Sequence, residues 1–236
     1  MRLYPSILLA ALLGGCANEP SYVPSGAPAS VSATPVKAGD FWEYRVFDAY
    51  TKIDQGLYRY EVKQADANRV VVDVTHDGQV VGTRVYAPGW NGIDARLPNV
   101  PDQLHFNPPF PAYEYPLEPG KSWYVVVNAT DAVTKATYRV HTRAKVVGWE
   151  RIRVPAGEFD ALRIQREVFA GNSTAVKTQE EIRETDWYVP AIQMAAITES
   201  SSQHFDNSMG GGDGGGEYPL RIRGDWLRGE LVRYSR

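Results

Sequence analysis

The sequence has a single cysteine, Cys16, so the chain has no partner for an intramolecular disulfide. It also lacks a long hydrophobic segment, because the apolar run from Ile7 to Leu13 is much shorter than the about 20 residues of a membrane-spanning helix. No stretch repeats apolar residues at the spacing of an amphipathic helix, so we expect few and short helices. Stability must therefore come from a core built mainly by strands.

Strong charge of one sign is missing too. The formal net charge is -3 at pH 7, and removal of residues 1–15, which include Arg2, would leave about -4. This weak acidic balance argues against nucleic acid, whose binding requires clustered Lys and Arg, and against electrostatic docking on anionic lipid. With 43% hydrophobic and 22% charged residues, the composition is that of an ordinary globular protein.

Motifs for metal binding and nucleophilic catalysis are absent. The histidines are scattered and form neither a His-x-His nor a His-Glu-x-x-His pair, so we expect no metal site and no cofactor. The strained Gly-x-Ser-x-Gly turn of many serine hydrolases does not occur either. The four histidines are His76, His105, His141 and His204.

The glycine-rich segment Met209–Gly216 fits neither a phosphate loop nor a calcium loop. It has no Gly-Lys-Ser/Thr to meet a phosphate, and Asp213 alone cannot supply the about six to eight oxygen ligands of calcium. Because glycine loses much backbone entropy on ordering, we expect a mobile loop here.

The N-terminus is the most informative part of the sequence. Arg2, the apolar run and the small residues Gly14 and Gly15 match the three regions of a secretory signal. With Leu-Gly-Gly directly before Cys16, the segment resembles the lipobox of bacterial lipoprotein signals. The resemblance implies that the lipoprotein-processing machinery removes residues 1–15 as a signal peptide and attaches lipid to the Cys16 thiol, which would anchor the protein to the membrane.

The residues after Cys16 indicate the destination and the linkage. Ala17, rather than Asp, follows the cysteine, which by resemblance to enterobacterial sorting rules implies delivery to the periplasmic face of the outer membrane. Retention at the inner membrane stays open as the alternative. Residues 16–38 are rich in Pro, Ser and Ala without an apolar period, so we expect a lipidated, disordered tether.

Residues 39–236 have the pattern of one all-β domain. Short runs rich in Val, Tyr, Trp and Thr alternate with period two between Gly, Pro, Asn and Asp. We expect a single curved antiparallel sheet, either a half-barrel or a β-roll. The runs on either side of Asp77-Gly78 predict a hairpin. The expected strands are Phe41–Tyr50, Gly56–Ala65, Arg69–His76, Gln79–Tyr86, Ser122–Ala129, Ala136–Glu150, Ile152–Val154, Ala161–Phe169, Lys177–Val189, Ile192–Ser200 and Leu227–Tyr234.

The proline-rich stretch Ala87–Pro119 interrupts this pattern. Because proline lacks the amide hydrogen that a sheet needs, we expect a long connection, either a flap over the sheet or a linker. The similar segments Ala38–Val46 and Pro119–Val127 suggest an alternative organisation, two duplicated meanders with their seam at residues 87–119. Chance recurrence of a turn followed by an aromatic residue would explain the same similarity.

Aromatic residues supply the candidate binding positions. Trp90 lies in a predicted loop, and Phe106, Phe110 and Tyr113 lie on the proline-rich stretch, so we predict that these four side chains contact a ligand. Tryptophans also fill the cores of β proteins, which is the competing interpretation.

Carboxylates on a later strand supply the competing hypothesis of an enzyme. Glu180, Glu184 and Asp186 share one face of the strand ending at Val189, and two carboxylates beside a cleft could act as acid and base. A solvated strand face with ion pairs is the interpretation that we favour, so we predict no catalytic residues.

One internal pattern resembles a family signature. Val154-Pro-Ala-Gly-Glu-Phe159 and the later Trp187-Tyr-Val-Pro190 look like a pattern in poorly characterised bacterial envelope proteins, and Glu230–Ser235 looks like their terminal strand. The resemblance covers roughly residues 119–236 and implies a curved antiparallel sheet similar to lipoprotein-carrier and β-roll folds. The sequence departs from that pattern after Pro190. The motif itself describes a turn and carries no catalytic residue.

The sequence therefore predicts a non-enzymatic outer-membrane lipoprotein. It would bind an apolar or amphipathic ligand, such as a lipid, or an envelope protein on a concave sheet face. An enzyme that acts on envelope polymers and a purely structural or assembly role remain as alternatives.

Overall fold

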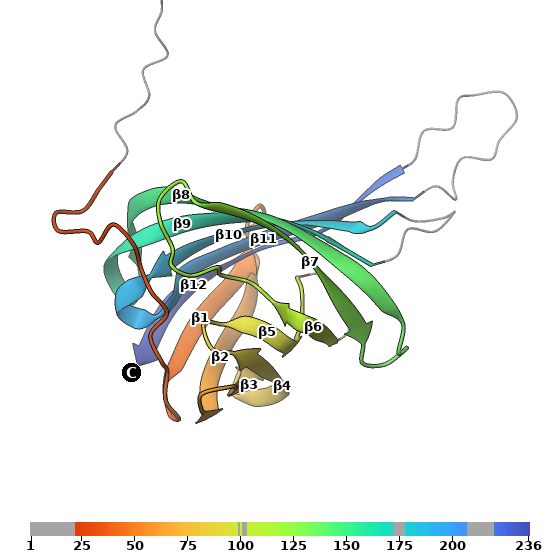
Figure 1. The fold of residues 1–236 in the computed structure, drawn as a ribbon, viewed down its shortest axis with the longest axis horizontal. Coiled ribbons are helices and arrows are strands. Elements are labelled where there is room, and N and C mark those ends of the chain that lie inside the picture. Colours follow the sequence, from red (N-terminus) through yellow and green to blue (C-terminus); the bar gives the residue numbers. More distant parts are fainter. Residues whose placement is uncertain (1–21, 99, 101–102, 172–177, 207–219) are drawn as a thin grey trace, which may run out of the picture.

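The computed structural model describes residues 22–98, 100, 103–171, 178–206 and 220–236 and shows a closed antiparallel β-barrel (Figure 1). Each strand pairs with its neighbours in the chain, and β1 pairs with β12 to close the sheet. One short 3-10 helix, Pro190–Ile192, joins β10 to β11. The strands are β1 (Phe41–Asp48), β2 (Asp54–Ala65), β3 (Val70–His76), β4 (Gln79–Ala87), β5 (Asn91–Ala95), β6 (Leu104–Phe110), β7 (Ser122–Asp131), β8 (Thr137–Val154), β9 (Gly157–Ala170), β10 (Glu180–Val189), β11 (Met194–Asp206) and β12 (Leu220–Ser235).

The prediction of an all-β fold is confirmed, but the prediction of an open half-barrel or roll is wrong. Phe41 pairs with Ser235 and Asp48 pairs with Leu227, so the whole of β1 is hydrogen-bonded to the last strand. Closure gives every strand two neighbours and removes the exposed edges that an open sheet would leave. The sequence pattern contains no signal for this, because pairing between the first and last strands is not a local property.

The hairpin between β3 and β4 has the expected geometry. Asp77 and Gly78 both adopt positive φ, 48° and 83°, which is the conformation of a type I′ turn. This turn matches the right-handed twist of its two strands, so a two-residue connection suffices.

The proline-rich stretch is not the continuous connection that we expected, because it contains β5 and β6. Strand β6 includes Pro108 and Pro109 but pairs with β7 only through Leu104–Asn107. On the other side, its pairs with β5 involve Leu104, His105 and Phe110. The two prolines therefore lie at positions that pair with neither β5 nor β7, where no amide hydrogen is needed for a hydrogen bond between strands.

The connection from β6 to β7, residues 111–121, folds over one end of the barrel. Tyr113 and Leu117 are buried in the main core, and Leu117 pairs with Val31 through main-chain hydrogen bonds of 2.8 Å in both directions. This end, which we call the closed end, also carries the 3-10 helix and the C-terminus (Figure 1).

Residues 22–38 differ from the disordered tether that their composition predicts. Val31 is 5% exposed within the core, and the Thr34 amide donates to Gln193 Oε1 at 2.8 Å. Near the start, the Tyr22 hydroxyl donates to Asp160 Oδ1 at 2.6 Å. One buried valine and a few main-chain contacts hold a segment whose composition alone indicates a linker.

The odd-numbered strands finish at the opposite end of the barrel, which we call the open end. Figure 1 shows β8 to β12 extending beyond the shorter wall formed by β1 to β6. The main core cluster lies toward the closed end and includes Trp42, Leu162 and Tyr188. A second cluster around Phe106 lies between β5, β6 and β7 to β10.

Several predictions concern residues outside the described part of the chain. These are the signal peptide of residues 1–15, the lipidation of Cys16 and the glycine-rich segment at 209–216. The duplication of two meanders stays a prediction. Within the described residues, no helix has the length and apolar character needed to cross a membrane.

Candidate functional site

The four aromatic residues predicted to contact a ligand are all buried. Trp90 is 8% exposed, its Nε1 donates to the Gln193 carbonyl at 2.7 Å, and its ring meets the edge of Trp42 at 5.3 Å. Phe106 and Phe110 pack together at 5.3 Å within the second core cluster. For these three, the structure matches the competing interpretation of core-filling aromatics.

Tyr113 reaches a charged cluster inside the barrel. Its hydroxyl donates to Asp186 Oδ2 at 2.7 Å, and its ring lies 5.5 Å from the Arg166 guanidinium carbon. Arg166 makes ion pairs with Asp186 at 2.7 Å and with Glu184 at 3.0 Å, and it donates to the Ala112 carbonyl. The interior therefore contains a cation that donates to two carboxylates and one carbonyl, with the Tyr113 ring beside it.

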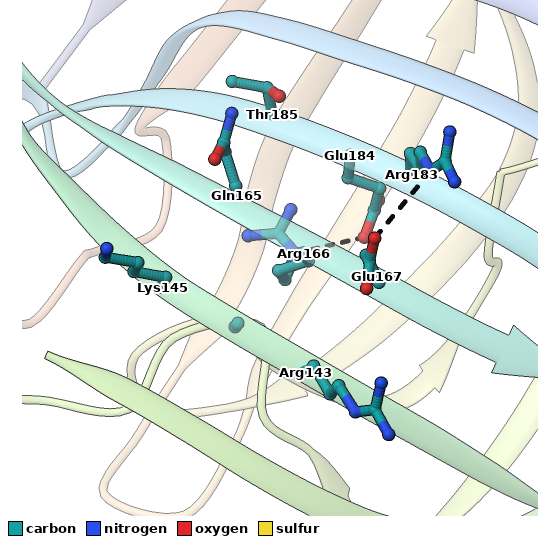
Figure 2. Close-up of a pocket in the computed structure, with 9 residues that line it drawn as sticks. Arg143, Lys145, Gln165, Arg166, Glu167, Arg183, Glu184 and Thr185 are labelled. Atoms are coloured by element: carbon teal, nitrogen blue, oxygen red, sulfur yellow. Dashed lines mark hydrogen bonds and ion pairs between the residues drawn. The ribbon is translucent and has the colours of Figure 1, made fainter.

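The solvated strand face expected on β10 is wrong for these carboxylates. The side chains of Glu184 and Asp186 are only 15% and 9% exposed, because that face of β10 turns into the barrel. The alternation itself was predicted correctly, since Arg183 and Thr185 lie on the outer face (Figure 2). What the sequence did not indicate was which of the two faces would be inside.

The acid and base proposed for an enzyme do not face one another. Glu180 pairs with His204 at 3.1 Å, whereas Glu184 pairs with Arg166. On an extended strand, residues four apart are separated by about 13 Å. Among the described residues, no three His, Cys, Asp or Glu side chains gather as metal ligands would.

Tyrosines surround the charged cluster, and burial raises their pKa values. For Tyr44 and Tyr113, desolvation is the main cause, and the Asp186 charge adds to it, so both pKa values lie well above the ordinary value. Burial likewise raises the pKa of Tyr188 to about 12. The interior around the charged cluster therefore favours neutral phenols, which act as hydrogen-bond donors.

We predict that alkaline pH destabilises the barrel for this reason. Unfolded tyrosines ionise near pH 10, whereas folded Tyr44, Tyr113 and Tyr188 stay protonated, so above that pH the unfolded chain binds fewer protons. The stabilisation is complete below about pH 10 and is lost as pH rises through the folded pKa values. Urea unfolding monitored by circular dichroism between pH 9 and 11.5 measures how steeply the free energy of unfolding falls with pH. Tyr44→Phe should make this fall less steep. Phe at the exposed Tyr124 serves as the control, and a midpoint independent of pH would contradict the prediction.

Solvent reaches the interior of the barrel beside the charged cluster. Thr198 pairs with Asp186 and Gly229, which places it on the inner face, yet its side chain is exposed. Gly82 pairs with the buried Val74 and therefore also faces inward, and a Cβ built on it would meet no heavy atom within 4 Å. The described side chains thus leave space inside the barrel beside Thr198 and Gly82.

Two inner-face hydroxyls are left without partners. Thr142 Oγ1 and Ser202 Oγ are buried and make no hydrogen bond within the described part of the chain. Their strand partners Val168 and Ile182 are fully buried core residues, so both hydroxyls point to the interior. Buried hydroxyls in proteins are nearly always satisfied, so these two are an exception among the described residues.

A second hollow, of about 350 Å³, lies on the outer face of β8, β9 and β10. In Figure 2, Arg143, Lys145 and Gln165 point away from the strands, and Arg183 pairs with Glu167. The side chains of that pair are 58% and 48% exposed. Screened, mobile side chains of this kind make a weaker candidate than the interior.

Comparison with solved structures finds chains of similar fold. A protein described as exported, with a YmcC-like fold, from Bacteroides fragilis is 16% identical at a TM-score of 0.48, and the match covers 87% of this chain and 100% of that chain. A protein from Parabacteroides distasonis described as a lipoprotein is 14% identical at 0.47, with 87% and 99% covered. The hypothetical lipoprotein YmcC from Escherichia coli is 9% identical at 0.42, with 84% and 85% covered. No protein-family model and no curated protein matches the chain, and we transfer no function from these similarities.

Proposed function

We propose that the protein is a lipid-anchored envelope protein that binds an amphipathic ligand inside the open end of its barrel, without catalysis. The observation that carries the proposal is the exposure of inner-face positions, above all Thr198 and the open space beside Gly82. The wall there combines apolar Val46 and Leu227 with the hydroxyl of Ser200, so it suits a ligand with both characters.

The described N-terminal segment supports an orientation of the barrel relative to the membrane. Residue 22 lies at the closed end, and the steps from Cys16 to Tyr22 span at most about 20 Å even when extended. A lipid on Cys16 would therefore hold the closed end near the membrane and turn the open end toward the periplasm. The expected location is the periplasmic face of the outer membrane.

The enzyme hypothesis has less support. A catalytic carboxylate needs access to its substrate, whereas Glu184 and Asp186 are both bound to the buried Arg166. Their negative charges are compensated within the protein, which favours a structural role for the cluster.

A pair of adjacent substitutions tests the binding proposal. Ser200 pairs with Glu184 and faces inward, whereas Ser201 pairs with Arg183 and lines a hollow of about 210 Å³ on the outer face. Ser200→Trp should abolish binding of an uncharged amphipathic probe, decyl glucoside, to the lipidated protein in nanodiscs, because the indole fills the interior. Ser201→Trp, the same change one residue along the strand, should leave it intact. The reverse pattern would place the ligand on the outer face and overturn the proposal.

A further inference from the structure

Arg84 is the inner-face cation that the described residues leave without a carboxylate. It pairs in register with the fully buried Val72, which directs its side chain into the barrel, and its side chain is only partly exposed. Among the described residues no Asp or Glu makes an ion pair with it, in contrast to Arg166, which has two.

The groups around Arg84 are neutral and aromatic. The guanidinium carbon lies 5.2 Å from the ring centre of Tyr60, and the hydroxyls of Tyr60 and Tyr86 interact with it. Burial by itself would lower the pKa of Arg84, but these two tyrosines more than offset it, so the pKa is raised and the side chain stays charged. A phenol orients a guanidinium without neutralising it, so the positive charge persists inside the barrel.

The position has room for a ligand group. Gly82, two residues before Arg84 on the same face of β4, has open space where a Cβ would stand. On β3, the buried Val72 and Val74 pair with these two residues, and Val74 lies close to the β3–β4 turn at the open end. A site with one uncompensated cation, phenol donors and an apolar wall is complementary to an amphipathic molecule that carries an anionic group.

We propose that Arg84, assisted by Tyr60 and Tyr86, binds the anionic headgroup, phosphate or carboxylate, of an amphipathic ligand held in the barrel. This inference rests on the proposed function and adds the chemical class of the ligand. An anion would form charge-assisted, bidentate hydrogen bonds with the guanidinium, which are stronger than bonds between neutral groups.

The test compares three probes of equal chain length: decyl phosphate, decanoate and decyl glucoside. Binding to the lipidated protein in nanodiscs is measured for the wild type, Arg84→Gln and Arg84→Lys, with empty nanodiscs subtracted. Arg84→Gln should weaken binding of the preferred anion by about tenfold to a hundredfold, the usual value of a hydrogen bond to a charged group, and should leave decyl glucoside unchanged. Arg84→Lys should keep part of the affinity. Preference between the two anions distinguishes a phosphate headgroup from a carboxylate.

The control is Arg143→Gln, on the outer face of β8, which should change none of the three affinities. Thermal unfolding of each variant verifies the fold, and Arg84→Lys retains the charge if Gln proves destabilising. If Arg84→Gln and Arg84→Lys both leave the affinities of both anions unchanged, the inference is wrong. In that case, the proposed function still stands if Ser200→Trp abolishes binding of decyl glucoside. If Ser200→Trp leaves that binding unchanged, both the proposed function and the inference about Arg84 are wrong.

Discussion

Arg166→Met should lower the free energy of unfolding by about 3–5 kcal/mol, the usual cost of removing one partner from a buried ion pair. Arg166 is 5% exposed and holds Glu184 and Asp186, both of which would stay inside the barrel without a counterion. Tyr113 could compensate only one of them, through its single hydroxyl donor. Urea unfolding at neutral pH measures the difference.

The matched control is Arg163→Met on the same strand. Arg163 faces outward and pairs with Glu150, and both side chains are about one-third exposed, so the expected cost is at most about 1 kcal/mol. A variant that replaces the whole cluster, Arg166→Met with Glu184→Gln and Asp186→Asn, should recover much of the stability lost, because no buried charge remains. Equal effects of Arg166→Met and Arg163→Met would contradict the assignment of Arg166 to the interior.

Cys16→Ser should move nearly all of the protein from the membrane fraction to the soluble fraction. The reason is chemical, because serine offers no thiol for the lipid that the sequence predicts. The barrel should stay folded, since all the core residues of both clusters lie after residue 22. Cell fractionation followed by a salt wash, together with labelling by a radioactive fatty acid, measures both anchoring and lipid content.

The control for this experiment is Tyr22→Phe, which removes the hydroxyl that contacts Asp160 and Arg151 and should leave the protein in the membrane fraction. A Cys16→Ser protein that stays in the membrane after the salt wash would refute the anchor. Separation of the two membranes on a sucrose gradient then decides between the outer membrane and the inner-membrane alternative.

Local chemistry explains which parts of the fold were predictable. The Asp77-Gly78 hairpin and the alternation along β10 depend on neighbouring residues, and both were predicted correctly. Closure of β1 on β12 depends on residues nearly 200 positions apart and leaves no trace in any one segment. Strand β6 was missed because its two prolines are a strong local signal against a strand. In the structure, Pro108 and Pro109 lie at positions that pair with neither β5 nor β7.

The candidate site was harder to predict than the fold. Aromatic content drew attention to Trp90 and Phe106, which the structure places in the core, while Arg84 carries no motif at all. A signal was present in the alternation of β4, which puts Arg84 on the same face as Tyr86 and Gly82. This alternation identifies Arg84 as an interior residue only if the inner face of β4 is known. Because β4 has polar residues on both faces, the tertiary structure is needed to show which face is inside.

Native mass spectrometry of the lipidated protein, released from its own membrane, tests the central claim most directly. We expect the wild type and Ser201→Trp to carry a noncovalent mass beyond that of the lipidated chain, and Ser200→Trp to carry none. A wild-type mass equal to the lipidated chain alone, or an added mass that Ser200→Trp retains, would contradict the proposal that the barrel interior binds a ligand.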